Sequence, residues 1–105
     1  MTERPDKLNN QAIILANGGD YYEAIACFKR ALTIEQNNYL LWYNLGLTYR
    51  DSGDIKNARL SLEKALHIAP ERLDVIDTLS TLCINDEDYE AALAYSQDGI
   101  DLAPD

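Results

Sequence analysis

The chain has 105 residues, enough for one small domain with a single hydrophobic core. Its hydrophobic fraction of 47% and charged fraction of 26% are ordinary for a folded globular protein and exclude a disordered or collagen-like chain. The net charge of −9 makes nucleic acid and anionic membranes poor partners, and no apolar run approaches the roughly 20 residues that a membrane span needs.

A repeat with a period of 34 residues organises the chain. Shifting the sequence by 34 positions aligns Asp20 with Asp54 and Asp88, and it also aligns several columns of small or apolar residues. Three units, over residues 5–38, 39–72 and 73–105, account for almost the whole sequence. Each unit has the apolar spacing of two helices.

The first unit predicts helices over residues 6–17 and 21–35. Gly18 and Gly19 separate them, because glycine adopts the backbone angles of a tight turn without strain. Asp20 and Glu23 have the spacing of a capping box, in which each side chain accepts a hydrogen bond from a free backbone N–H at the start of the helix.

The second unit predicts helices over residues 39–51 and 55–68. Gly53 suits the left-handed conformation that ends a helix, Asp54 is expected to cap the next one, and Pro70 ends it. The first of these helices has an apolar face with the spacing i, i+3, i+4 and i+7, made of Trp42, Leu45, Gly46 and Tyr49.

The third unit predicts helices over residues 73–85 and 89–102, joined by the turn Asp86-Glu87-Asp88 without a glycine. Residues 73–105 hold nine acidic residues and no Lys or Arg, so the whole net charge lies there. Such a block is either a solvated face or a docking surface for a basic partner, and the sequence leaves both interpretations open.

The two cysteines, Cys27 and Cys83, form no C-x-x-C motif, which favours free thiols in a reducing compartment. The N-terminal residues contain no apolar stretch of the kind that makes a secretory signal. We therefore expect a cytoplasmic protein in which both cysteines pack as small hydrophobic side chains.

The middle unit resembles the tetratricopeptide repeat. The resemblance rests on Trp42-x-x-Leu45-Gly46-x-x-Tyr49, followed by Ala58, Leu62, Ala65 and Pro70. The outer units match less well, as expected for terminal repeats that meet water on one side. The resemblance implies an all-α fold, a right-handed superhelical solenoid of three helix–turn–helix repeats with six helices, forming one domain over residues 1–105.

No constellation of residues in the sequence points to catalysis or to a cofactor. Ser61 and Lys64 fit the S-x-x-K pattern of penicillin-recognising enzymes, but the partner motifs are missing and the pair lies inside a predicted repeat helix. His67 has no second His or Cys near it in the sequence. We therefore expect no enzymatic activity, no cofactor and no metal site.

The resemblance also implies where a ligand binds. The first helices of the repeats would line a concave groove that holds an extended or helical segment of another protein. Ile13, Tyr43 and Leu47 would form an apolar patch there, while Asn10 and Asn44 would present amides that can donate to and accept from a peptide backbone. The expected groove residues are Asn10, Ile13, Asn17, Leu40, Tyr43, Asn44, Leu47, Arg50, Asp74, Asp77 and Thr78.

An alternative at this surface is that Leu40 packs on the preceding helix and the asparagines are only solvated. A clamp for the C-terminal carboxylate of chaperones, which some family members have, is not expected, because Asn44 is the one position that matches it. The expected partner is a protein or peptide, with basic character toward the third unit, and neither nucleic acid nor membrane.

Two rival functions are a self-associating scaffold and a regulatory module split from a larger enzyme or chaperone partner. The first rival arises because the final helix would leave apolar side chains uncovered, drawn from Leu93, Tyr95, Ile100 and Leu102. Polar residues between them and the negative charge of this unit favour a monomer that associates weakly as salt rises.

Overall fold

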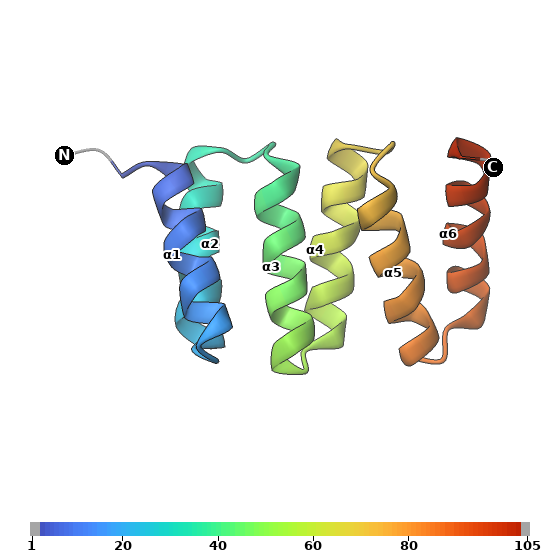
Figure 1. Ribbon diagram of the computed structural model, residues 1–105, viewed down its shortest axis with the longest axis horizontal. Helices are drawn as coiled ribbons and strands as arrows, with labels where there is room; N and C mark the ends of the chain where they lie inside the picture. The colour runs from blue at the N-terminus through green and yellow to red at the C-terminus, as the bar shows by residue number, and fades with distance from the viewer. Residues whose placement is uncertain (1–2, 104–105) are drawn as a thin grey trace.

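The computed structural model describes residues 3–103, which form six α-helices and no strand (Figure 1). The predicted bounds are confirmed to within one residue at every end. The helices are α1 (Pro5–Asn17), α2 (Tyr21–Ile34), α3 (Tyr39–Ser52), α4 (Ile55–Ile68), α5 (Leu73–Asn85) and α6 (Tyr89–Leu102).

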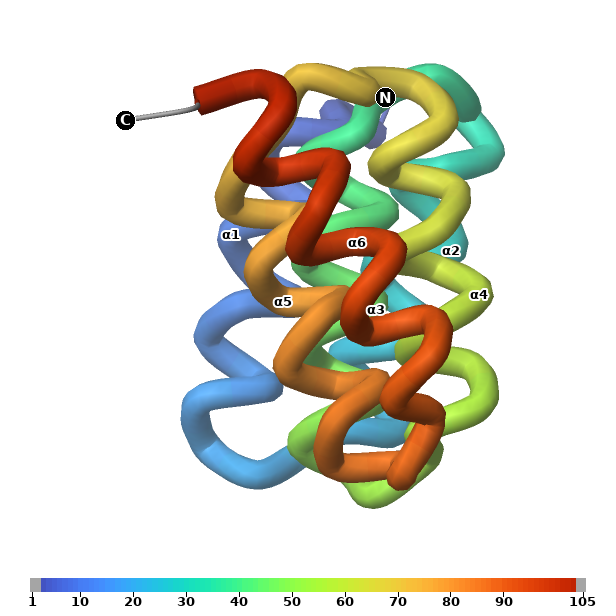
Figure 2. Tube along the Cα trace, turned by 90° about the vertical axis from the view of Figure 1, so that its right-hand side faces the viewer, coloured from blue at the N-terminus to red at the C-terminus, as the bar shows by residue number. Residues whose placement is uncertain are grey.

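The helices pack in chain order as three hairpins, α1 with α2, α3 with α4 and α5 with α6, in an elongated row of 46 × 25 × 20 Å (Figure 1). Viewed along the row, α1 and α5 lie on one side and α2 and α4 on the other (Figure 2). The molecule is therefore a two-layered solenoid with an inner layer of α1, α3 and α5.

The turn inside each hairpin is built the same way three times. The backbone N–H of Asp20, Asp54 or Asp88 donates to the carbonyl five residues earlier, at 2.8–2.9 Å, which closes the preceding helix. The residue before each aspartate has a left-handed backbone, with φ of 85° at Gly19, 91° at Gly53 and 60° at Glu87. The third repeat thus makes the turn without glycine, as the sequence indicated.

Asp54 and Asp88 cap the following helices, each accepting from the backbone N–H three residues on at 3.2 Å. The capping box predicted for Asp20 and Glu23 is wrong, because Asp20 makes no side-chain hydrogen bond to its helix. Its carboxylate lies beside Gly18 in the preceding turn instead.

The core consists of two clusters of buried apolar side chains that meet at α3. One is built from α1, α2 and α3 around Phe28, and the other from α4 and α5 around Leu62. Trp42 and Tyr49, both half-buried, pack against both clusters. Gly46 allows the close approach of α3 and α4, because a Cβ there would lie 2.7 Å from Leu62 Cγ.

The row ends in a sparsely covered helix. Leu93 and Ile100 of α6 are 72% and 54% exposed, and Leu102 is also exposed, whereas Tyr95 is half-buried. Three of the four apolar side chains named from the sequence are therefore uncovered.

The two cysteines are free thiols. Cys83 is buried and Cys27 is half-buried, and neither is in a disulfide.

Candidate functional site

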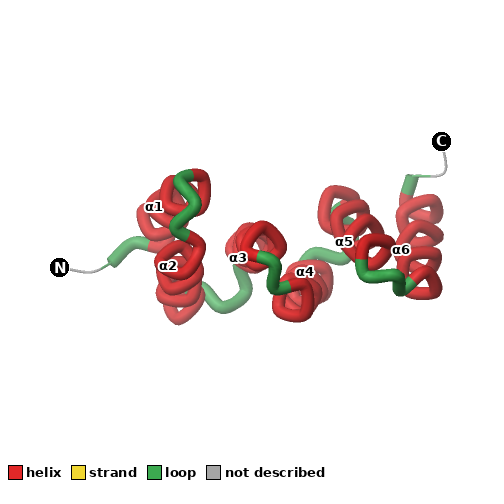
Figure 3. The backbone as a smooth tube through the Cα atoms, turned by 90° about the horizontal axis from the view of Figure 1, so that it is seen from below, coloured by secondary structure: helices red, strands yellow, loops and turns green. Residues whose placement is uncertain are grey.

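The inner layer presents a hollowed face, as the first helices of a repeat stack were expected to do. Seen from below, α3 is set back between α1 and α5 (Figure 3). Two hollows of about 190 Å³ each lie on this face, one over α1 and α3 and the other over α3 and α5. We call this surface the inner groove.

The hollow over α1 and α3 brings together five of the predicted groove residues. Ile13 and Leu47 give it an apolar wall, and its rim is polar. The predicted residues that line it are Ile13, Asn17, Asn44, Leu47 and Arg50.

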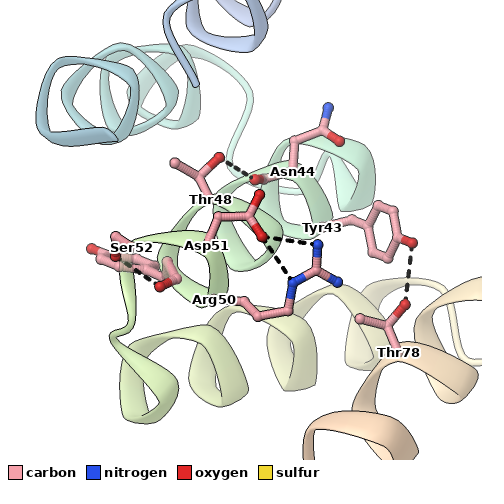
Figure 4. A network of polar contacts seen from close by, with 8 residues as sticks. Tyr43, Asn44, Thr48, Arg50, Asp51, Ser52 and Thr78 are labelled. Atoms are coloured by element: carbon pink, nitrogen blue, oxygen red, sulfur yellow. Dashed lines mark hydrogen bonds and ion pairs between the residues drawn. The ribbon is translucent and has the colours of Figure 1, made fainter. Parts of the chain in front are cut away.

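The hollow over α3 and α5 shares one residue with its neighbour. Arg50 lines both hollows, and Asp77 and Thr78 from α5 line the second. Two nitrogens of the Arg50 guanidinium donate to Asp51 Oδ1 at 3.1 Å (Figure 4). The central charge of the groove is thus held against a carboxylate on its own helix.

Asn44 is placed differently from the expected pair of amides. Its Nδ2 donates to Asn9 Oδ1 at 3.0 Å, so the amides of Asn44 and Asn9 join α3 to α1, a pairing that the sequence did not predict. Asn10 is exposed on α1 and lines neither hollow. The two amides were expected to be free side by side. Instead, the amide of Asn10 is exposed and that of Asn44 is hydrogen-bonded to Asn9.

Tyr43 does not lie with Ile13 and Leu47 as expected. Its hydroxyl lies 3.2 Å from Thr78 Oγ1 on α5, and its ring packs against the core cluster around Leu62 (Figure 4). Tyr43 therefore ties the second repeat to the third, and the apolar wall of the inner groove is formed without it.

Leu40 and Asp74 lie away from the two hollows. Leu40 is exposed in a separate hollow of about 430 Å³ near the N-terminal ends of α1 and α3. Asp74 accepts two hydrogen bonds from Arg72, at 3.1 and 3.0 Å, and this contact holds the pKa of Asp74 below its usual value. Of these two aspartates, Asp77 is the exposed one, and its carboxylate is free to meet a ligand.

A second, larger cavity lies on the other face, and the sequence analysis missed it. We call it the outer cleft. It has a volume of about 750 Å³ and is lined by Lys29, Leu32, Thr33, Gln36 and Asn37 of α2 and the loop after it, by Trp42, Leu45 and Tyr49 of α3, and by Asn57, Leu60, Ser61 and Lys64 of α4. Ser61, a small polar residue among the buried positions of α4, is the signal that could have indicated it.

Within residues 3–103, no group of three or more His, Cys, Asp or Glu side chains is arranged to hold a metal ion. In the same part of the chain, none of the helices has the length and apolar character needed to cross a membrane.

Three stacked helical hairpins with a hollowed inner face define a helical-repeat protein of the α-solenoid class. The family model of the tetratricopeptide repeat matches residues 3–71, and the chain belongs to this family. The match covers the first two repeats, in agreement with the weaker pattern of the third.

A curated relative is the peroxisomal targeting signal receptor of Candida albicans, 29% identical over 83 residues. The match covers 79% of this chain and 14% of the receptor, so the chain corresponds to a small part of that protein.

Solved structures share the fold at low sequence identity. The Sgt2 TPR domain from Aspergillus fumigatus has a TM-score of 0.87 at 24% identity, over 99% of this chain and 69% of that one. MamA has a TM-score of 0.90 at 17% identity, over 94% of this chain and 58% of that one. The second TPR of Spaghetti (RPAP3), bound to the HSP90 peptide SRMEEVD, has a TM-score of 0.85 at 16% identity, over 95% and 93%.

Proposed function

We propose that this chain is a non-enzymatic interaction module that binds an extended or helical segment of a partner protein in the inner groove. The proposal rests on two adjoining hollows on one face of the stack. Ile13 and Leu47 line the first hollow, and Arg50 lines both. An apolar wall beside polar groups at fixed positions is the usual composition of a ligand site.

The chemistry of the groove indicates the kind of segment that fits. An apolar side chain of the partner would enter the hollow beside Leu47, and polar backbone groups would meet the exposed amide of Asn17. Toward the third repeat, Asp77 is exposed and no Lys or Arg follows Arg72 in the sequence. A segment with basic residues at that end therefore complements the groove.

The relatives support a peptide ligand in general terms. The RPAP3 domain is bound to an HSP90 peptide, and the Candida albicans protein is a receptor for a targeting signal. The same ligands are not proposed here, because the positions at which a carboxylate clamp would need cations are Asn9, Asp74 and Thr78 in this chain. We place the module in the cytoplasm on the evidence of its two free thiols.

The proposal is tested by selecting peptides that bind the chain from a random library and measuring their affinities by fluorescence anisotropy. Leu47→Asp should weaken a groove-binding peptide at least tenfold, which is about 1.4 kcal/mol, because it places a charge in the apolar hollow. Ile14→Asp, a matched change at a 71% exposed site on α1, should leave the affinity unchanged. Equal effects of the two changes would contradict groove binding.

A second candidate is the self-associating scaffold, and the exposure of Leu93 and Ile100 on α6 favours it. Light scattering over a salt series separates the two functions. A monomer that associates weakly as salt rises agrees with the interaction module, and a tight dimer at low salt that Leu93→Asp dissociates agrees with the scaffold.

A further inference from the structure

The outer cleft is lined by residues of α2 and the loop after it, of α3 and of α4, with those of α3 at its floor. Figure 3 shows α2 and α4 on the same side of α3. Its volume of about 750 Å³ falls within the range of about 300–1,000 Å³ that is typical of ligand sites. The cleft shares none of its lining residues with the inner groove.

The charge of the outer cleft is positive although the chain as a whole is strongly negative. Lys29 and Lys64 are the two charged residues that line it, and neither forms an ion pair within residues 3–103. The helices that supply them, α2 and α4, together carry five basic and two acidic side chains, whereas α6 carries three acidic side chains and no basic one. Two unpaired ammonium groups at one opening attract carboxylates.

The floor of the outer cleft is apolar and aromatic. Trp42 lies there with its indole N–H already donating to the carbonyl of Gln36 at 2.9 Å, so that the ring offers its apolar surface to a ligand. Lys29 Nζ lies 5.9 Å from the centroid of the Tyr49 ring, which holds the ammonium at the edge of this floor. Leu60, 56% exposed, extends the apolar surface along α4.

The corresponding place one repeat further along is filled and acidic. Thirty-four residues after Ser61 stands Tyr95, which is half-buried and donates from its hydroxyl to Glu63 Oε2 at 3.1 Å. Glu63 itself occupies the position of Lys29, and Asp98 that of Lys64. The cleft between the first two repeats is therefore not a general feature of the stack, because it depends on a serine and two lysines that the next space lacks.

We propose that the outer cleft is a second peptide-binding site, which takes an acidic segment with one bulky apolar side chain. The apolar side chain lies over Trp42 and against Leu60, and carboxylates on either side of it pair with Lys29 and Lys64. The exposed amide of Asn37 at the rim is available to the peptide backbone. A chain with both sites joins an acidic segment on its outer face to a different segment in its inner groove.

Trp42 is the only tryptophan of the chain, so its fluorescence reports on this cleft directly. The probe is a blocked pentapeptide with four acidic residues around one phenylalanine, titrated at low salt. We expect saturable quenching or a shift of the Trp42 emission, and weaker binding as salt rises because the ammonium groups are exposed. A version with lysines in place of the acidic residues, and one with serine in place of the phenylalanine, should not bind.

Variants locate the peptide. Lys29→Gln with Lys64→Gln should weaken binding about tenfold or more, whereas Lys56→Gln, an exposed lysine of α4 outside the cleft, is the matched control and should not. Ser61→Tyr should block the cleft, since tyrosine fills the equivalent space at Tyr95. Far-UV circular dichroism verifies that each variant is folded, and Leu47→Asp in the inner groove should leave this binding unchanged.

The proposal is overturned by an unchanged Trp42 emission, by equal binding of the lysine peptide, or by a Lys56→Gln effect as large as that of the double variant. Loss of binding in Leu47→Asp would place the peptide in the inner groove and overturn the second site alone. If sedimentation shows that Lys29→Gln with Lys64→Gln abolishes self-association of the free chain, the occupant is the acidic α6 of a second copy, and the proposed partner is wrong.

Discussion

Between the first and second repeats, Ser61 and Lys64 of α4 leave a cleft open over Trp42, while between the second and third repeats Tyr95 of α6 fills the same place. The outer helices α2, α4 and α6 each have 14 residues, and the hairpin turns before α4 and α6 share the same backbone hydrogen bond from the capping aspartate. The side chains that face the two spaces differ: Ser61 and Lys64 stand at one, and Tyr95 and Asp98 stand at the equivalent positions of the other.

The way the repeats are joined at the turns differs as well. Arg59 of α4 donates to Asp88 at the start of α6 at 2.8 Å, and this ion pair ties the second repeat to the third. The residues at the equivalent positions one repeat earlier are Ile25 and Asp54, and the Asp54 carboxylate accepts from Asn57 instead. The boundary between the second and third repeats therefore has an ion pair at its turn that the first boundary lacks.

The largest expected effect is the removal of the floor of the open space. Trp42→Ala should lower the free energy of unfolding by about 3–5 kcal/mol, because the indole packs against both core clusters. Ile76→Val, at the equivalent buried position of the filled space, should cost about 0.5–1.5 kcal/mol. Urea unfolding followed by far-UV circular dichroism measures both. A cost below about 1 kcal/mol for Trp42→Ala would mean that the indole does not join the clusters.

Opening the filled space is expected to have a smaller effect. Tyr95→Ser should cost about 2–3 kcal/mol, since it removes a half-buried ring and leaves Glu63 without its donor. Burial raises the pKa of Tyr95 to about 12, so its contribution to stability is complete below pH 10 and is lost as pH rises toward 12. In an alkaline absorbance titration, one of the seven tyrosines should ionise late, and Tyr95→Phe should remove that late step.

The ion pair at the turn should give a weaker, pH-dependent effect. The hydrogen bond from Arg59 holds the pKa of Asp88 below its usual value of 3.8, so the pair stabilises the fold above that pH. This stability is lost as pH falls through the lowered pKa, because the carboxyl is then protonated in the folded state too. Asp88→Asn should therefore lower stability at neutral pH and flatten its decline in acid.

Asp54→Asn is the matched control for that change. The pKa of Asp54 is also lowered, by hydrogen bonds from Asn57, but no arginine is bound to it. In urea unfolding at a series of pH values, Asp54→Asn should therefore flatten the decline of stability in acid less than Asp88→Asn does. Equal changes for the two variants would mean that helix capping, and not the pairing with Arg59, stabilises the turn.

The six helices could be predicted from the sequence because most of their boundaries carry a local signal. Gly53 with Asp54 ends one helix and starts the next through backbone and side-chain hydrogen bonds within a few residues, and Pro70 follows the end of α4. A capping aspartate after a turn recurs at intervals of 34 residues, at Asp20, Asp54 and Asp88, and this interval predicted the three repeats. These features depend only on neighbours along the chain.

The candidate sites depend on how one helix lies against another, and the sequence was less informative there. Helical spacing placed Tyr43 with Leu47, but the closeness of α5 draws the Tyr43 hydroxyl to Thr78. Asn44 likewise finds Asn9 across the first repeat boundary. The outer cleft was not predicted because it depends on how α2, α3 and α4 lie against one another around Ser61, which no spacing along the chain shows.

The smallest expected effect concerns the turn of the third repeat, where Glu87 has a φ of 60° and the other two repeats have glycine. A non-glycine residue in the left-handed region lowers the stability of the folded state by about 1–2 kcal/mol. Glycine avoids this strain, but it increases the entropy of the unfolded chain, which lowers stability by about 0.4–1 kcal/mol. Glu87→Gly should therefore stabilise the fold by about 0.5–1 kcal/mol, and Gly53→Ala should destabilise the matching turn by about 1 kcal/mol. Glu87→Gln removes the same negative charge and keeps the strained backbone, so its stability should equal that of the original chain. If Glu87→Gln gained as much as Glu87→Gly in urea unfolding, repulsion within the acidic third repeat, and not the backbone of this turn, would be what separates it from the second.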